Sequence, residues 1–179
     1  MTSLTQQQVD AAQAFANATI AALQTDRGVH AETAIAATAR MAGTFLFRSF
    51  GFPAQDLVPG HAVLSDLANE QGPPLVQLLG GVLSELGIEL DAERFGEDID
   101  PGNTPHREFL DTQKMLEPGY LAISRQHDLS GREAAIAGVI ASAFLIHQCA
   151  QVLDPNIAFG VAVYGLIEGA KTVPGPAAP

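Results

Sequence analysis

Residues 134–167 carry a single formally charged side chain, that of Asp154. Ser130 and Glu133, three residues apart, have the spacing of a capping box, which predicts that a helix begins directly after Ser130. Asp154 and the proline that follows it predict a turn, after which the helical spacing of apolar residues resumes. A helix that is apolar on all sides must be buried, so we expect a helical hairpin over residues 131–170 at the centre of the fold.

An apolar run of this length also raises the question of a membrane span. Many of its apolar positions are only alanine, and the run contains Ser142, His147, Gln148 and Gln151. Its flanks lack the clusters of Lys and Arg that anchor a span in a bilayer. We therefore predict a buried core element and no contact with a membrane.

The rest of the chain has the spacing of amphipathic helices, interrupted by turns rich in glycine and proline. The expected helices cover residues 5–24, 30–49, 61–69, 74–86 and 104–117, with Pro118 kinking or dividing the last of these. We predict an all-α fold, a single-domain irregular or orthogonal bundle of about seven helices over residues 1–172. The Pro-, Gly- and Ala-rich residues 173–179 have nothing to bury, so we expect a disordered tail there.

Acidic residues outnumber basic ones, which gives the 179-residue chain a formal net charge of −11. This charge repels the phosphates of nucleic acids and of anionic lipids, so nucleic acid is not an expected partner. The single cysteine, Cys149, cannot form an internal disulfide, and the first residues lack the order of a secretion signal. We therefore expect a cytoplasmic protein.

The sequence signatures of common enzymes are missing from the chain. It contains no GxxxxGK[ST] or GxGxxG loop, no GxSxG elbow, no CxxC and no HExxH, and it lacks the Glu-x-x-His pairs of a di-iron bundle. Convergent sites need no such motif, so these absences favour a non-enzymatic role without deciding the question. We expect no cofactor and no metal site.

Polar side chains on the second predicted helix and on the hairpin form a candidate pocket for a small molecule. Its members are His30, Glu32, Arg40, Arg48, His147 and Tyr164. Arg40 and Arg48 lie about 80° apart around the helix axis, so both can border one cleft. The alternative is structural, because a buried arginine needs a partner, and Glu32 or an acid of another helix would form an ion pair with it.

Four phenylalanines follow one another closely at the end of the second predicted helix. Phe45 belongs to the apolar stripe of that helix, whereas Phe47 and Phe50 point elsewhere and Phe52 lies in the following loop. Aromatic side chains outside a core stripe are typical of protein interfaces, so Phe47, Phe50 and Phe52 form a candidate interface. The alternative is that they pack beneath the loop.

The leading functional hypothesis is a non-enzymatic protein that binds another protein or a second copy of itself. It depends on the missing catalytic signatures, the aromatic residues and the helices rich in small side chains. One alternative is a helical protein that binds a small molecule or metal near Arg40, Arg48 and His147, with hydrolysis as a candidate activity. Another is an acidic protein that neutralises a basic partner, which the net charge permits.

Overall fold

The computed structural model describes residues 4–53, 55, 57–94 and 104–177. Within these residues the chain forms six α-helices and one short 3-10 helix, which are α1 (Gln6–Leu23), α2 (Ala31–Ser49), α3 (Asp66–Glu85), η2 (Ala92–Arg94), α4 (Phe109–Gln126), α5 (Gly131–Cys149) and α6 (Pro155–Lys171). The only β-type pairings among the described residues are two isolated bridges, Thr25 with Gly28 and Ala62 with Thr172. The predicted all-α class is confirmed.

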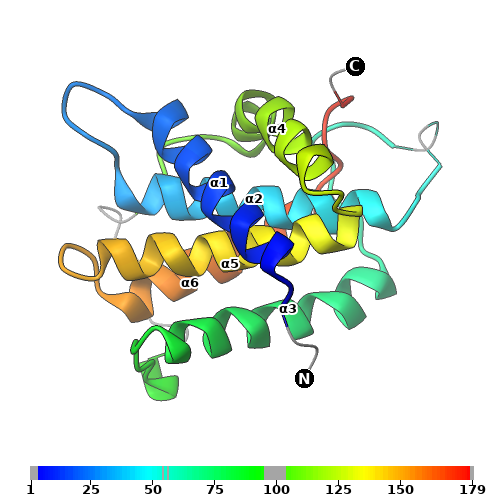
Figure 1. Ribbon diagram of the computed structural model, residues 1–179. Coiled ribbons are helices and arrows are strands. Elements are labelled where there is room, and N and C mark those ends of the chain that lie inside the picture. The colour runs from blue at the N-terminus through cyan, green and yellow to red at the C-terminus, as the bar shows by residue number, and fades with distance from the viewer. Residues whose placement is uncertain (1–3, 54, 56, 95–103, 178–179) are drawn as a thin grey trace.

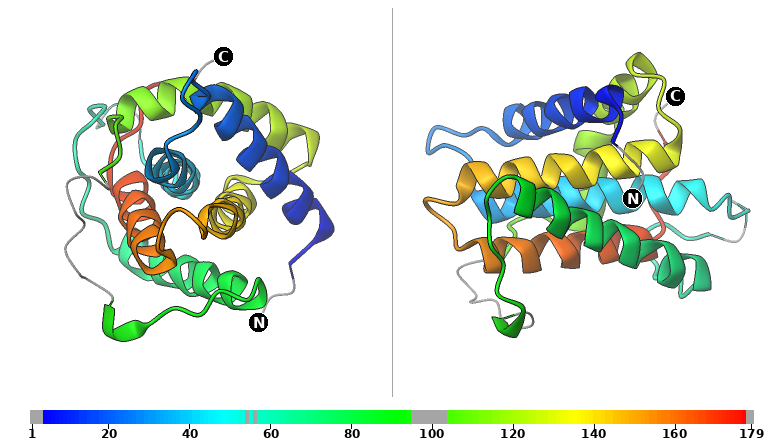
Figure 2. Two further views of the ribbon diagram at one scale, coloured as in Figure 1. Left: turned by 90° about the vertical axis from the view of Figure 1, so that its left-hand side faces the viewer. Right: turned by 60° about the horizontal axis from the view of Figure 1, so that its bottom comes forward.

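Helices α2 and α5 occupy the inside of the bundle. The end-on view in Figure 2 shows them enclosed by α1, α3, α4 and α6, and Figure 1 shows α5 running antiparallel to α2. Nearly every residue of α2 is buried, from Glu32 to Phe47. The C-terminal hairpin was predicted to be the centre, and α5 does lie there, but α6 packs mainly against α2 and only slightly against α5.

Glycines allow α2 and α6 to pack with their backbones in contact. A Cβ atom on Gly165 would lie 2.9 Å from the Ala36 carbonyl oxygen, and one on Gly169 would lie 3.0 Å from the Gly43 Cα. On the other side of α2, a Cβ on Gly138 of α5 would come within 2.8 Å of a side chain. Contacts this short exclude any larger side chain, so the three glycines set the spacing of the central helices.

A small polar network lies inside the otherwise apolar core. The Tyr120 hydroxyl of α4 is 2.6 Å from the Thr19 hydroxyl of α1, and the Thr38 hydroxyl of α2 donates to Thr19 at 3.0 Å. The Tyr120 ring stacks on Phe15 with 4.2 Å between the ring centroids. Burial raises the pKa of Tyr120 to about 12, since the charged phenolate would lose its hydration.

Two helices differ from the expected boundaries. Residues 66–85 form one helix through Pro73 and Pro74, where two were predicted, and α4 continues through Pro118. Pro73 and Pro74 have no N–H group to donate to the carbonyls of Asn69 and Glu70, one turn earlier. Both of these residues are exposed, so water can donate to their carbonyls instead. The start of α4 was expected near residue 104, but the helix begins at Phe109.

Candidate functional site

Arg40, the first arginine of the predicted pocket, connects three parts of the bundle. Its Nε donates to Glu168 Oε2 of α6 at 2.6 Å, and its Nη1 donates to the Arg107 carbonyl oxygen at 2.5 Å. The same Nη1 lies 3.4 Å from the Thr112 hydroxyl of α4. Its side chain is only 9% exposed. Arg40 therefore forms a structural ion pair, which was the alternative to a pocket, and its partner is Glu168 of α6 instead of Glu32.

Arg48, the second arginine, forms a two-pronged ion pair with α4. Its Nε and Nη2 donate to the two carboxylate oxygens of Glu117 at 2.5 Å and 2.9 Å. The Glu117 side chain is 1% exposed, and Gln113, one turn earlier, also donates to it. Because a buried carboxylate needs such partners, Glu117 fixes both side chains in position.

The C-terminal residues lie across this polar group. We call residues 172–176 the strap. Arg48 Nη2 donates to the Gly175 carbonyl oxygen at 2.8 Å, and the Gly175 amide donates to Gln113 Oε1 at 2.9 Å. Val173 and Pro174 are buried. The expectation that these residues have nothing to bury was wrong for the strap, because its backbone bonds hold it in place; residues 178 and 179 lie outside the described residues.

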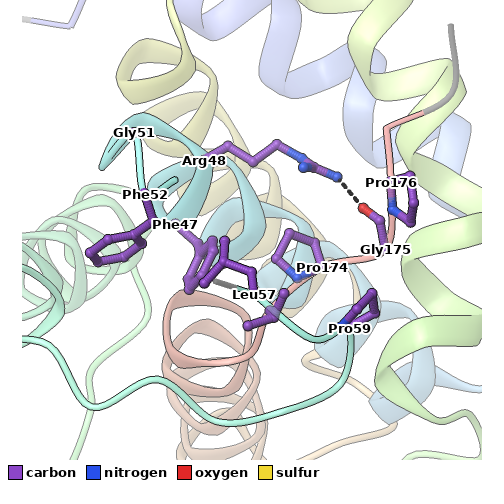
Figure 3. Close-up of a pocket in the computed structure, with 10 residues that line it drawn as sticks. Phe47, Arg48, Gly51, Phe52, Leu57, Pro59, Pro174, Gly175 and Pro176 are labelled. Carbon is purple, nitrogen blue, oxygen red and sulfur yellow. Dashed lines mark hydrogen bonds between the residues drawn. The ribbon is translucent and has the colours of Figure 1, made fainter. Parts of the chain in front are cut away.

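A cavity of about 420 Å³ opens between the strap and the end of α2. Figure 3 shows Phe47, Phe52 and Leu57 on one side, Pro174 and Pro176 on the other, and the Arg48 guanidinium reaching across to Gly175. A second cavity of about 380 Å³ lies on the far side of the strap, against Gln113, Glu117 and other residues of α4. Gly175 and Pro176 of the strap line both cavities.

His30 and Glu32 lie at the opposite end of α2. His30 caps the helix by accepting from the Thr33 amide, its ring stacks on His106 at 3.8 Å between centroids, and its Nε2 lies 3.3 Å from Glu32. Burial, with a smaller contribution from the Glu32 charge, raises the pKa of the Cys149 thiol nearby. Within the described residues no group of three His, Cys, Asp or Glu side chains is placed to hold a metal ion.

The remaining pocket residues do not join the arginines. His147 is exposed in the last turn of α5, which lies beside the start of α2, whereas Arg48 lies in the last turn of α2. Tyr164 is 64% exposed on α6. The six predicted residues are therefore spread over both ends and the outer surface of the bundle, and the structure does not bring them together as one pocket.

The candidate interface phenylalanines mainly contact one another. The ring of Phe47 is 6.3 Å from that of Phe50 and 5.3 Å from that of Phe52, measured between centroids. Phe47 is buried, and the other two are half-buried. Phe47 and Phe52 also line a cavity between α2 and the strap, and their role as an interface stays a prediction.

An apolar surface that sequence analysis did not single out lies between α3 and α6. A groove of about 420 Å³ there is lined by Ala68, Asn69, Gly72, Pro73, Val76, Gln77, Leu166, Ile167, Ala170 and Lys171. Ile167, one of the lining residues, is 47% exposed, and Tyr164, one turn earlier on α6, is 64% exposed. We call this feature the α3–α6 groove.

No family model, no curated protein and no solved structure matches this chain. Among the described residues, no single helix combines the length and apolar character that a membrane span requires. Helices α4 and α5 reach that threshold only as a pair, and an angle of 112° separates them.

Sequence analysis missed the residues that hold the strap. Gln113 and Glu117 share the buried face of α4 with Phe109, Leu116 and Tyr120. Two polar residues one turn apart on an apolar face are the signal that could have indicated a buried polar group. The strap itself has no such signal, because its backbone makes the bonds.

Proposed function

We propose that this protein is a non-catalytic binding module that holds a helix of a basic protein partner in the α3–α6 groove. The observation that carries the proposal is the exposure of Tyr164 and Ile167 on α6 at a groove of about 420 Å³. A partner helix that places its apolar face in such a groove removes these side chains from water, which is a common mode of peptide recognition.

The geometry of the groove suits a helix. Its walls are two helices, with Gly72 and Pro73 of α3 facing Ala170 of α6, and these small side chains leave space for residues of a partner. Gly72 has no atom of another segment within 4 Å of the position of a Cβ atom. An apolar stripe at i, i+3 or i+4, and i+7 on the partner would therefore fit between α3 and α6.

Charge selects the kind of partner. Lys171 lines the groove, but Asp66 and Glu70 are exposed in the first turns of α3, and the whole chain has a net charge of −11. A helix with Lys or Arg beside its apolar stripe is attracted by this surface. A second copy of the chain would bring the same negative charge, so a basic partner is favoured over self-association.

Selection from a peptide library tests the proposal with the purified protein. A displayed library of amphipathic helices of about 15 residues is panned against the wild-type chain. We expect enriched sequences with an apolar stripe and flanking Lys or Arg, and binding that weakens as salt concentration rises. Enriched peptides without a basic bias, or no enrichment, would overturn the proposal.

Two variants locate the binding surface. Ile167→Glu places a charge in the groove and should reduce peptide affinity at least about tenfold, the equivalent of 1.4 kcal/mol. Val152→Glu is the matched control, because Val152 is 82% exposed in the turn before α6, at the far end of that helix from the groove. Equal losses in both variants, or no loss in Ile167→Glu, would show that the peptide does not bind in the groove.

The small-molecule alternative has no comparable support at the six predicted residues. Arg40 and Arg48 are bonded to Glu168 and Glu117, and His147 lies at the other end of the bundle from Arg48. This alternative stays a prediction.

A further inference from the structure

The strap is bonded in the manner of a bound peptide. The Val173 amide donates to the His61 carbonyl oxygen at 2.9 Å, and the Val173 carbonyl accepts from the Gly60 amide at 2.8 Å. Gly175 is bonded through both of its backbone groups as well, by Gln113 and Arg48. Every second residue of the strap is thus fixed through its N–H and its C=O.

The residues between these bonded positions are prolines. Pro174 and Pro176 have no N–H group, so the strap leaves no amide donor unbonded at those two positions. Proline also restricts the chain to an extended conformation, which lowers the entropy lost when such a segment binds. Residues with an amide alternate with prolines along the strap. The neighbouring segments offer hydrogen-bond partners at Val173 and Gly175, so the two patterns match.

The surface under the strap is organised by residues other than the strap. Glu117 holds the Arg48 guanidinium through two hydrogen bonds and accepts a third from Gln113. The Arg48 guanidinium, which donates to Gly175, and the Gln113 side chain, which accepts from it, are therefore held in place by contacts between α2 and α4. Cavities of about 420 Å³ and 380 Å³ adjoin the strap; Pro174 and Pro176 line the first, and Pro176 lines the second.

The position of Gly175 is also selective. A Cβ atom there would lie 3.1 Å from Gln113 Oε1, the same atom that accepts the Gly175 amide. A side chain there would force Gln113 Oε1 to shift by a few tenths of an ångström, which strains that bond. The surface therefore favours glycine between two prolines.

We propose that this surface, which we call the strap groove, recognises an extended Val-Pro-Gly-Pro type segment of a partner protein, and that the strap occupies it until the partner displaces it. The partner is a different protein, because two chains of net charge −11 repel each other. The tethered strap competes at a high effective concentration, so it sets the concentration at which a partner can bind. This site is separate from the α3–α6 groove and does not depend on it.

The test uses the full chain with the substitution Gly175→Val, which weakens the strap and leaves the groove intact. The probe is the blocked peptide of residues 171–177, Lys-Thr-Val-Pro-Gly-Pro-Ala, added to isotope-labelled protein and followed by NMR. We expect saturable shifts at the Gln113 side-chain amide. A peptide with valine in place of glycine is the matched control and should bind more weakly.

Wild-type protein provides the competition measurement. A strap that is closed about 90% of the time raises the apparent Kd of the peptide tenfold relative to Gly175→Val. Arg48→Lys in the Gly175→Val background retains a positive charge but not the forked geometry, and should weaken binding. Arg132→Lys, on the exposed surface of α5, should leave binding unchanged.

Three outcomes would overturn the proposal. The folded Gly175→Val chain could bind neither peptide, or bind both equally, which would remove the basis for recognition of glycine. Wild-type and variant could bind the peptide equally, which would show that the strap does not compete. Native mass spectrometry could show a wild-type dimer that Gly175→Val abolishes, which would make a second copy the occupant. If Gly175→Val does not fold, titration of the wild-type chain with both peptides at millimolar concentration decides between these outcomes.

Discussion

Replacing Gly169 by alanine tests how strictly the glycines set the packing of α6 on α2. An added Cβ would overlap the Arg40 carbonyl oxygen and lie 3.0 Å from the Gly43 Cα. Both of these atoms belong to the backbone of α2, so no side-chain rotation can relieve the overlap. The two helices must move apart by about 1 Å, which loosens the dense packing on both sides of the contact.

The expected cost follows from two opposing effects. Overpacking a dense core costs about 1–3 kcal/mol, and a clash with backbone belongs at or above the upper end of that range. Alanine in place of glycine inside a helix recovers about 1 kcal/mol. We therefore expect Gly169→Ala to lower the free energy of unfolding by about 2 kcal/mol and the Tm by about 4–8 °C.

Urea unfolding followed by far-UV circular dichroism measures this difference, and the same helix supplies the control. Gly160 lies in α6 with nothing within 4 Å of a Cβ position. Gly160→Ala should therefore stabilise the protein by up to about 1 kcal/mol. If Gly169→Ala proves as stable as Gly160→Ala, the close contact between α2 and α6 does not exist as described.

Three further predictions concern buried or capping groups. Tyr120→Phe should lower the free energy of unfolding by about 1 kcal/mol at neutral pH, because it removes a buried hydrogen bond. The pKa of Tyr120 is raised to about 12 in the folded protein, so the wild-type protein should also lose stability as the pH rises from 10 to 12. Urea midpoints measured against pH should show a smaller alkaline loss in Tyr120→Phe than in wild type. Arg48→Met should lower the free energy of unfolding by about 3–5 kcal/mol, because it leaves the buried Glu117 carboxylate without its ion-pair partner. The double variant Arg48→Met, Glu117→Met should recover much of this loss, as measured by thermal unfolding. Ser130→Ala removes a hydrogen bond that lowers the pKa of Glu133, so its difference in Tm from wild type should shrink as the pH falls below about 4.5.

The helices were predictable where the signal is local. The capping box of Ser130 and Glu133 is present, and α5 begins at Gly131 as expected. A cap depends on side chains within three residues of one another, so the sequence contains all of the information needed. Pro73 and Pro74 were expected to end a helix, but the helix continues through them. Whether a proline ends a helix depends on whether the carbonyls one turn earlier can bond to water, and tertiary packing decides that.

The bonding partners were not predictable for a similar reason. A buried arginine at position 40 or 48 requires an acid, but the chain offers many acids on other helices. Only the crossing of α2 with α6 and with α4 selects Glu168 and Glu117. The strap was missed because its Pro- and Gly-rich composition predicts no burial, whereas hydrogen bonds of its backbone to other segments hold it in place and bury Val173 and Pro174.

The burial of α2 explains why the predicted pocket and the proposed binding surfaces lie in different places. Its residues are enclosed from Glu32 to Phe47, so its polar side chains face protein and not solvent; Arg40 is bonded to Glu168, whereas the buried Thr44 hydroxyl has no hydrogen-bond partner in the part of the chain that the structure describes. A partner can reach only the elements outside this centre. The α3–α6 groove lies on the outer helices, and the strap groove uses Arg48, in the last turn of α2, where the helix emerges and its side chain is 28% exposed. We therefore expect partner proteins to bind at the end of α2 or on the outer helices that cover it, and not along the buried length of α2.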